Sequence, residues 1–229
     1  KMVSISNGTT TSVSFYNRLS SGSVKITKTT NTGQNLGGWK IGLYTDSACT
    51  KPVSGSPFTT GADGTVTVSG LQKGTYYAKE NPTDDPYWEF DTAVKSVTVA
   101  VGQPAEVTFT NTHYGRIEIH KTTNTGNQLG GWTFRVRDSE GNSYGDFTTD
   151  DNGYACTQNL PLGRYTVVEL PTEDNYWLTE LGFNNVTGKA GETTVDTWLN
   201  KEQGLVWFYK KTNTGQSVEG WHITVYSDE

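Results

Sequence analysis

Apolar and polar residues alternate in short runs along most of the chain, which is the pattern of half-buried β-strands. Runs such as SVKIT and EVTFT place every second side chain on an apolar face. Turn signals such as ADGT and DDNG separate these runs, and no convincing run has a helical period. The pattern predicts an all-β protein built from sandwiches of about seven short strands each.

The same order of runs occurs more than once. The segment SVKITKTTNTGQNLGGWKIGLYTDS matches RIEIHKTTNTGNQLGGWTFRVRDSE and, further on, LVWFYKKTNTGQSVEGWHITVYSDE. A period of about 90 residues is the size of a small β-sandwich. We therefore expect two complete domains, at residues 20–113 and 114–202. Residues 1–19 match the last two strands of a preceding repeat, and residues 203–229 match the first strands of a following one.

Composition and charge exclude several classes of function. The 229 residues carry a net charge of -6 and no basic stripe, which argues against a nucleic-acid partner. No apolar stretch is long enough to cross a bilayer, so we expect no membrane insertion of this segment. The three histidines lack ligand spacing, and we expect no metal and no cofactor. The acidic turns PTDDP and PTEDN leave calcium binding open as a lesser alternative.

Two cysteines, Cys49 and Cys156, occupy unlike places in the repeat. A shared disulfide framework would place them at equivalent positions, so we expect two unpaired thiols.

Three polar residues recur in phase at the ends of strand-like runs. They are a lysine after the first run, a glutamate after a central run and an asparagine after the last run: Lys28, Glu80 and Asn111 in the first copy, and Lys121, Glu169 and Asn200 in the second. In each run the polar residue shares a face with the apolar row before it. The alternation therefore points all three side chains toward the interior, where an uncompensated charge is costly.

This layout resembles the Cna B-type (SpaA-like) immunoglobulin-like domains of Gram-positive surface adhesins and pilins. The shared pattern is a strand ending in Lys, a TG turn, L-x-G before a second strand, a DG turn, L-x-x-G-x-Y-x-x-x-E, and a last strand ending in Asn. It covers essentially the whole chain. One departure is the GW pair at Trp39, Trp132 and Trp221, where the family usually has a smaller residue. We interpret this departure as altered core packing that leaves the three polar residues untouched.

The resemblance implies an intramolecular isopeptide bond in each complete domain, joining Lys28 to Asn111 with Glu80 as proton shuttle. The second domain would join Lys121 to Asn200 with Glu169 in the same role. Burial lowers the pKa of a lysine and raises that of a glutamate, which suits an amine nucleophile and an acid that assists it. The alternative is a buried, hydrogen-bonded Lys–Glu pair beside an uninvolved asparagine.

The partial repeats carry equivalents of two of these residues. Asn17 aligns with the acceptor Asn111, and Lys210 aligns with the donor Lys28. Neither has a glutamate of its own repeat within the chain. We expect no bond at either residue unless a neighbouring chain completes the domain.

The predicted function is that of a structural stalk segment of a cell-surface adhesin or pilus-like fibre, outside the cell and anchored to the wall in the full-length protein. Its partners would be the neighbouring repeats, and a host surface protein or glycan is a further candidate. The alternative is a ligand-binding adhesin module that exposes aromatic rings such as Tyr87, Trp88, Tyr176 and Trp177. No set of nucleophile, histidine and acid recurs, so we expect no enzyme beyond single-turnover bond formation.

Overall fold

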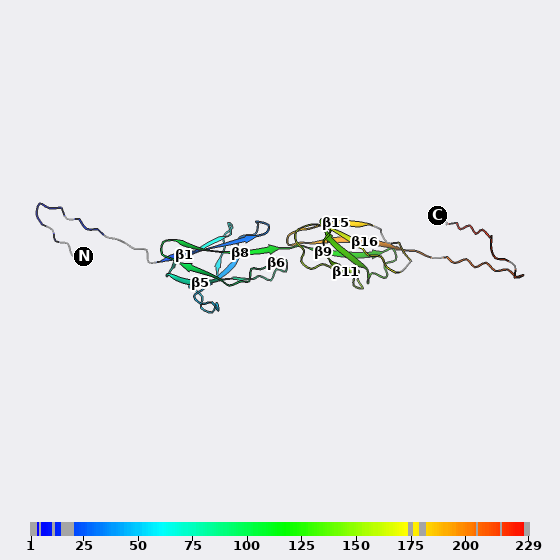
Figure 1. Ribbon diagram of the computed structural model, residues 1–229, viewed down its shortest axis with the longest axis horizontal. Helices are drawn as coiled ribbons and strands as arrows, with labels where there is room; N and C mark the ends of the chain where they lie inside the picture. Colours follow the sequence, from blue (N-terminus) through cyan, green and yellow to red (C-terminus); the bar gives the residue numbers. More distant parts are fainter. Residues whose placement is uncertain are drawn as a thin grey trace.

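The computed structural model describes residues 4, 6–10, 12–14, 21–173, 176–178, 182–204, 206–215 and 217–226. Within these residues it contains 16 β-strands and no helix, which confirms the all-β prediction. Figure 1 shows two sandwiches placed end to end, with an extended segment leading away from each.

The first domain consists of two four-stranded sheets. Their orders are β4-β1-β8-β6 and β3-β2-β5-β7. The strands are β1 (Gly22–Thr30), β2 (Lys40–Tyr44), β3 (Phe58–Thr59), β4 (Thr65–Leu71), β5 (Gly74–Asn81), β6 (Trp88–Glu89), β7 (Lys95–Val99) and β8 (Pro104–His113).

The second domain repeats this topology in sheets β12-β9-β16-β14 and β11-β10-β13-β15. Its strands are β9 (Arg116–Thr123), β10 (Thr133–Asp138), β11 (Ser143–Thr148), β12 (Tyr154–Cys156), β13 (Gly163–Glu169), β14 (Trp177–Leu178), β15 (Phe183–Gly188) and β16 (Thr193–Glu202).

The first and last strands of each domain lie side by side and run parallel. In the first domain Lys28 is opposite Phe109, and Thr30 is opposite Asn111. β9 and β16 pair in the same way, and the remaining ladders are antiparallel. Side chains alternate in face along a strand, so Lys28 and Asn111 point to the same side of their sheet. Asn111 lies two residues beyond the direct partner of Lys28, which makes the two residues diagonal neighbours.

The turn after the first strand does not form a hairpin. β1 belongs to one sheet and the next strand, β2, belongs to the other. Residues 31–39 therefore cross from layer to layer. The strands also continue past the polar residues that the sequence places at their ends: β1 runs on to Thr30 and β8 to His113.

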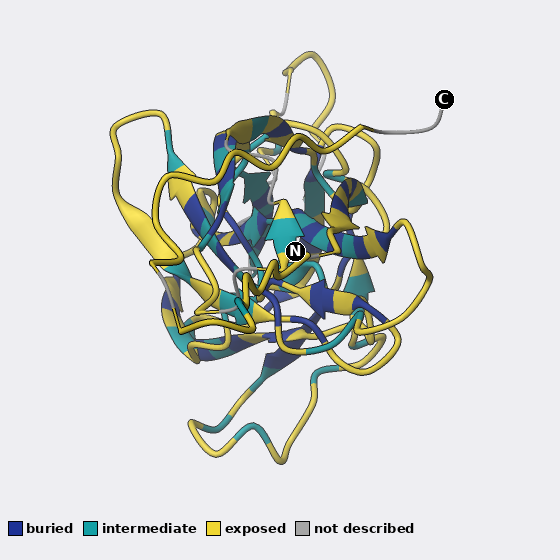
Figure 2. Ribbon diagram, turned by 90° about the vertical axis from the view of Figure 1, so that its right-hand side faces the viewer, coloured by how far each residue is buried: buried dark blue, intermediate teal, exposed yellow. Residues whose placement is uncertain are grey.

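The inward faces of the strands form one hydrophobic core in each domain. Ile26, Ala78 and Phe109 are fully buried in the first domain, as alternation predicts. Phe134 and Trp198 occupy the second core, where their rings contact each other at 5.3 Å between centroids. Figure 2, which looks along the long axis, shows the buried segments in the interior and the exposed loops around them. Each large side chain buried in this way contributes about 1.5–3 kcal/mol.

The junction between the domains is short and closely packed. The Tyr87 hydroxyl hydrogen-bonds Thr193 Oγ1 at 2.7 Å, and the Arg116 guanidinium lies over the Tyr87 ring. Asn159 Nδ2 donates to Pro86 O at 2.8 Å. Side chains of both domains thus meet across the linker, which restricts hinge motion.

The extended ends contain no strand within their described residues, 4–14 and 203–226 with their gaps. Most of these residues are exposed. Strands need a partner for their backbone groups, and no described residue of either end belongs to a ladder of the two domains, although Gln203 N donates to Tyr176 O at 2.7 Å. The assignment of both ends to neighbouring repeats stays a prediction.

A turn glycine in each domain closes tightly over the backbone of the buried lysine. A Cβ added at Gly153, where φ is +85°, would lie 2.5 Å from Lys121 O.

We expect Gly153→Ala to destabilise the second domain by about 2–3 kcal/mol, since it combines backbone strain with a steric clash. The control is Gly126→Ala, where φ is +72° but no atom lies within 4 Å. It should cost about 1 kcal/mol. Thermal unfolding of both variants checks this, and equal losses would rule out the clash.

Candidate functional site

Each domain buries one lysine, one glutamate and one asparagine between its two sheets. In the first domain these are Lys28 on β1, Glu80 on β5 and Asn111 on β8. Their exposed fractions are 1%, 2% and 0%. β1 and β8 belong to one sheet and β5 to the other, so the three side chains reach the core from both layers.

Glu80 lies at the centre of this group. Lys28 Nζ donates to its two oxygens at 3.0 Å and 2.8 Å, and Asn111 Nδ2 donates to Oε1 at 2.7 Å. The backbone N–H of Asp91 donates to Asn111 Oδ1 at 2.9 Å. One carboxylate oxygen therefore bridges the amine and the amide nitrogen, while a separate donor polarises the amide oxygen.

The second domain brings the same three residue types into contact through its glutamate. Lys121 on β9, Glu169 on β13 and Asn200 on β16 have exposed fractions of 2%, 9% and 0%. Lys121 Nζ lies 3.1 Å from Glu169 Oε1, and Asn200 Nδ2 donates to the same oxygen at 2.8 Å. The structure thus brings together both sets of residues that the sequence singles out.

Burial dominates the electrostatics of the first site. It lowers the pKa of Lys28 below the usual lysine value, although the hydrogen bond and the charge of Glu80 act in the opposite direction. An amine with a lowered pKa is more often neutral, and a neutral amine is a nucleophile. A buried ion pair by itself is a poor source of stability, because desolvation offsets the attraction between its charges.

Comparison with known proteins places this arrangement in a family. A family model described as SpaA, prealbumin-like fold domain, matches residues 22–113 and 115–202. The chain belongs to this family. The resemblance to SpaA-like domains that the sequence motifs indicate is therefore confirmed. No curated protein matches the chain.

Several solved structures are similar to the chain. The Bacillus anthracis TIE protein is 26% identical with a TM-score of 0.43, and the match covers 80% of this chain and 34% of that one. A streptococcal ancillary pilin is 20% identical with a TM-score of 0.38, covering 80% of this chain and 63% of that one. The shaft pilin SpaA from Lactobacillus rhamnosus GG is 13% identical with a TM-score of 0.37, covering 81% and 99%. This chain thus spans about a third of the length of the TIE protein.

The tryptophan of the GW pair forms part of the site in each SpaA domain. Lys28 Nζ lies 4.5 Å from the ring centroid of Trp39, and Lys121 Nζ lies 4.3 Å from that of Trp132. The sequence-based interpretation that this residue leaves the polar group untouched is therefore wrong. The equal spacing from lysine to tryptophan in each copy is a signal that could have revealed the contact.

The sequence KTTNTG occurs at residues 28–33 and 121–126 and is called the hexapeptide below. Its threonines and glycine shape the turn after the buried lysine. In the first SpaA domain the Thr30 hydroxyl donates to the backbone oxygen of Gln34 at 2.8 Å. The backbone N–H of Gly33, whose φ is +66°, donates to Thr30 O at 3.1 Å. Thr123 and Gly126 make the equivalent bonds in the second domain, at 2.8 Å and 3.2 Å. The motif thus closes a turn that directs the chain toward the other sheet.

The asparagine of the hexapeptide clamps the last strand, a role that sequence reasoning missed. Asn31 Nδ2 donates to His113 O at 3.0 Å, and its Oδ1 accepts from His113 N at 2.8 Å. Asn124 holds Glu202 through the same two groups, at 3.4 Å and 2.8 Å. The side-chain amide acts as an additional rung between the first and last strands, just beyond the buried site.

The partial-repeat residues have different outcomes. Asn17 lies outside the described residues. Lys210 is exposed, and its Nζ lies 3.7 Å from the ring centroid of Trp221. The tryptophan contact thus recurs in the third copy.

The four aromatic residues proposed for ligand binding do not gather on one exposed face. Tyr87 packs at the junction, and Trp88 stacks on His113 at 3.8 Å between ring centroids. Trp177 meets Trp132 edge to face, and Tyr176 is 48% exposed.

Other site types find little support in the part of the chain that the structure describes. No group of three or more His, Cys, Asp and Glu side chains is arranged to hold a metal ion. None of the described segments forms a helix that could cross a membrane. Both cysteines are free.

The asparagine clamp yields a stability prediction. Asn31→Ala removes two hydrogen bonds between the turn and the end of β8, so the first domain should lose about 1–2 kcal/mol. Gln34→Ala is the control in the same turn, since Gln34 joins that turn through its backbone. Thermal unfolding should distinguish the two variants. Equal effects would show that the clamp contributes nothing specific.

Proposed function

We propose that the chain is a structural stalk segment of a Gram-positive surface adhesin or pilus-like fibre, and that each SpaA domain closes itself with a Lys–Asn isopeptide bond. The observation that carries the proposal is the buried group in which Glu80 touches both Lys28 Nζ and Asn111 Nδ2. The same group recurs in the second domain. The cell-surface location and the wall anchor of the full-length protein belong to the same proposal.

The reaction is an amide exchange. Lys28 passes one proton to Glu80, and its neutral Nζ attacks Cγ of Asn111. A bond forms between Nζ and Cγ, and the bond from Cγ to Nδ2 breaks. Glu80 delivers the proton that it took from Lys28 to Nδ2, which leaves as ammonia, and then accepts the second proton, which the attacking nitrogen releases, so that it ends protonated and neutral. Proximity supplies much of the acceleration, because the folded core holds the three groups in contact before any bond changes.

The position of the bond suits a load-bearing element. Tension along a row of domains enters each sandwich at its first strand and leaves at its last. Because β1 and β8 are parallel neighbours, this load shears their ladder instead of opening it one bond at a time. A covalent tie between the two strands would carry the load past every other strand of the domain.

The bond would also stabilise each domain against unfolding. It closes a loop of about 80 residues, and a crosslink of that length is worth about 4 kcal/mol by restriction of the unfolded chain. It needs no oxidising compartment. The packed junction at Tyr87 and Arg116 supports the same role, since it couples one domain directly to the next.

Intact mass under denaturing conditions tests the proposal. Each bond releases one ammonia of about 17 Da, so two bonds predict a mass about 34 Da below that of the sequence. Lys28→Ala and Glu80→Ala should each recover one increment. Lys25→Ala, on the same strand with a solvent-exposed side chain, should leave the full deficit apart from the substitution itself. A wild-type chain at its sequence mass would exclude the bonds.

The pH dependence of bond formation provides a second test. Burial lowers the pKa of Lys28 below the 10.5 of an unperturbed lysine, so the neutral amine persists to lower pH. The rate of the first bond should rise with pH and level off below pH 10.5. Freshly refolded, unreacted chain can be sampled over time by mass spectrometry at a series of pH values. A rate that keeps rising to that pH would show an unperturbed lysine.

A further inference from the structure

One aromatic ring accompanies the lysine in all three copies of the motif. Trp39, Trp132 and Trp221 each follow their lysine by the same spacing in the sequence. The distances from Nζ to the ring centroid are 4.5 Å, 4.3 Å and 3.7 Å. These distances are within the range of a cation–π contact, in which the ammonium is attracted to the ring face.

Local structure fixes the ring in both complete domains. Trp39 Nε1 donates to Asn35 O at 2.6 Å, and Trp132 Nε1 donates to Gln128 O at 2.7 Å. Asn35 and Gln128 have φ of +55° and +53°, a conformation that residues other than glycine rarely adopt. Strain of this kind persists where the surrounding structure holds it in place, and it is common at functional sites. Here it aims a backbone oxygen at the indole nitrogen.

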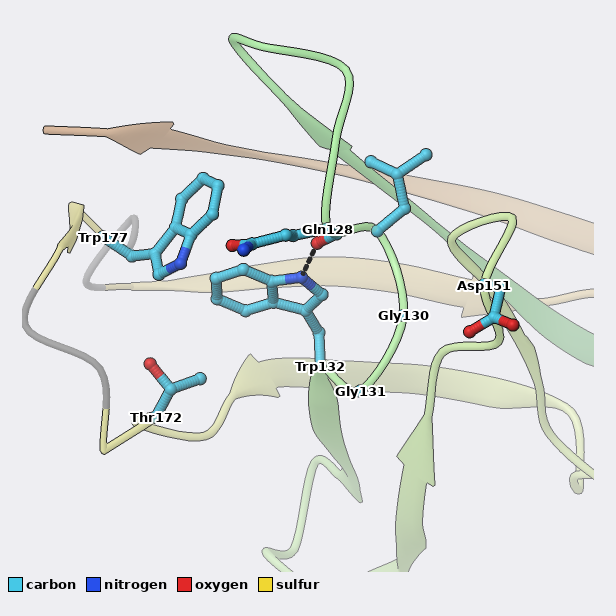
Figure 3. Close-up of a pocket in the computed structure, with 8 residues that line it drawn as sticks. Gln128, Gly130, Gly131, Trp132, Asp151, Thr172 and Trp177 are labelled. Carbon is cyan, nitrogen blue, oxygen red and sulfur yellow. Dashed lines mark hydrogen bonds between the residues drawn. The ribbon is translucent and has the colours of Figure 1, made fainter.

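A second tryptophan packs against the first. Trp88 meets Trp39, and Trp177 meets Trp132, edge to face with centroids 5.1 Å and 5.3 Å apart. Figure 3 shows Trp132 and Trp177 side by side, with the indole nitrogen of Trp132 bonded to Gln128. The inner ring of each pair touches the lysine.

The inner ring also separates the lysine from solvent. In the second domain a cavity of about 530 Å³ is lined by Trp132, Trp177 and the backbone around Gly130, but not by Lys121. The first domain has an equivalent cavity of about 330 Å³ beside Trp39 and Trp88. With exposed fractions of 7% and 4%, Trp39 and Trp132 form the wall between each open cavity and the buried amine.

The third copy shows that the contact does not depend on the rest of the site. Lys210 is exposed and belongs to a segment that forms no strand in its described residues. Its Nζ nevertheless lies over the Trp221 ring. The motif therefore brings lysine and tryptophan together in a segment whose described residues form no strand.

We propose that Trp39 and Trp132 are positioning residues for isopeptide formation. Each ring holds the lysine amine against the glutamate and the asparagine and keeps water away from it. This inference rests on the proposed function. The covalent step is the amide exchange given above, and the tryptophan takes no part in bond making or proton transfer.

The test measures the rate at which each isopeptide bond forms, and the bond of the unchanged domain serves as the internal reference. Chain freshly made by cell-free synthesis is quenched at intervals, and peptide mapping reports the Lys28–Asn111 and Lys121–Asn200 links separately. The variants are Trp39→Leu, which removes the ring, and Trp39→Phe, which keeps a ring face. Trp88→Leu is the control, because Trp88 packs on Trp39, whereas the ring that lies beside Lys28 Nζ is that of Trp39.

The expected result is a selective loss. Trp39→Leu should slow the first bond on the order of ten-fold relative to the second, and Trp39→Phe should recover part of the rate. Trp88→Leu should change the ratio less than about two-fold. The converse variant, Trp132→Leu, should slow the second bond and leave the first unchanged.

Other outcomes overturn the inference in distinguishable ways. If Trp39→Leu leaves the ratio of the two bond-formation rates unchanged, or if Trp88→Leu slows the first bond equally, the Trp39 ring acts only in packing. The proposed isopeptide bond would remain supported in either case. Thermal unfolding of both leucine variants in a Glu80→Gln background compares their stabilities when no first bond can form. If the first domain of Trp39→Leu does not fold, the rate of the first bond in Trp39→Phe is the test. A wild-type rate in Trp39→Phe would overturn the role of the indole. Wild-type chain that forms neither link removes the proposed function and this inference together.

Discussion

The placement of a lysine ammonium against a glutamate carboxylate inside an apolar sandwich is the constraint on which the rest of each domain depends. Two charges removed from water gain little from each other, because desolvation consumes most of their attraction. Both domains nevertheless keep the pair at 2.8–3.1 Å in a buried core, with an asparagine amide on the same carboxylate. An arrangement that contributes little stability as an ion pair is well suited to chemistry, and amide formation would remove the buried charges.

The topology determines which strands this group of three residues connects. The first and last strands are parallel neighbours in one sheet, and the glutamate reaches between them from the opposite sheet. The site therefore joins the strand by which the chain enters the domain to the strand by which it leaves, near the end where the chain leaves. The asparagine clamp at Asn31 and Asn124 adds hydrogen bonds between the same two strands just outside the site. Neighbouring domains meet through Tyr87, Arg116 and Thr193, which under the proposed function would pass a load directly from one sandwich to the next.

The repeated hexapeptide combines several of these functions in one short stretch. Its lysine enters the core, its threonine and glycine close the turn, and its asparagine holds the last strand. The tryptophan that follows closes the core over the lysine. In the two complete domains each of these positions therefore has a separate contact.

The sequence alone determined the all-β class, the family and the inward direction of the six polar side chains, because alternation in a strand is a local property of the backbone. It also located the motif residues whose spacing repeats. The tertiary structure decided which strands are neighbours: β1 pairs with β8, and the turn after β1 crosses to the other sheet instead of forming a hairpin. It likewise decided that Glu80 touches both Lys28 and Asn111 and that Asn31 reaches His113. These contacts join residues from separate strands and loops, and their distances depend on how two sheets pack, which no local pattern records.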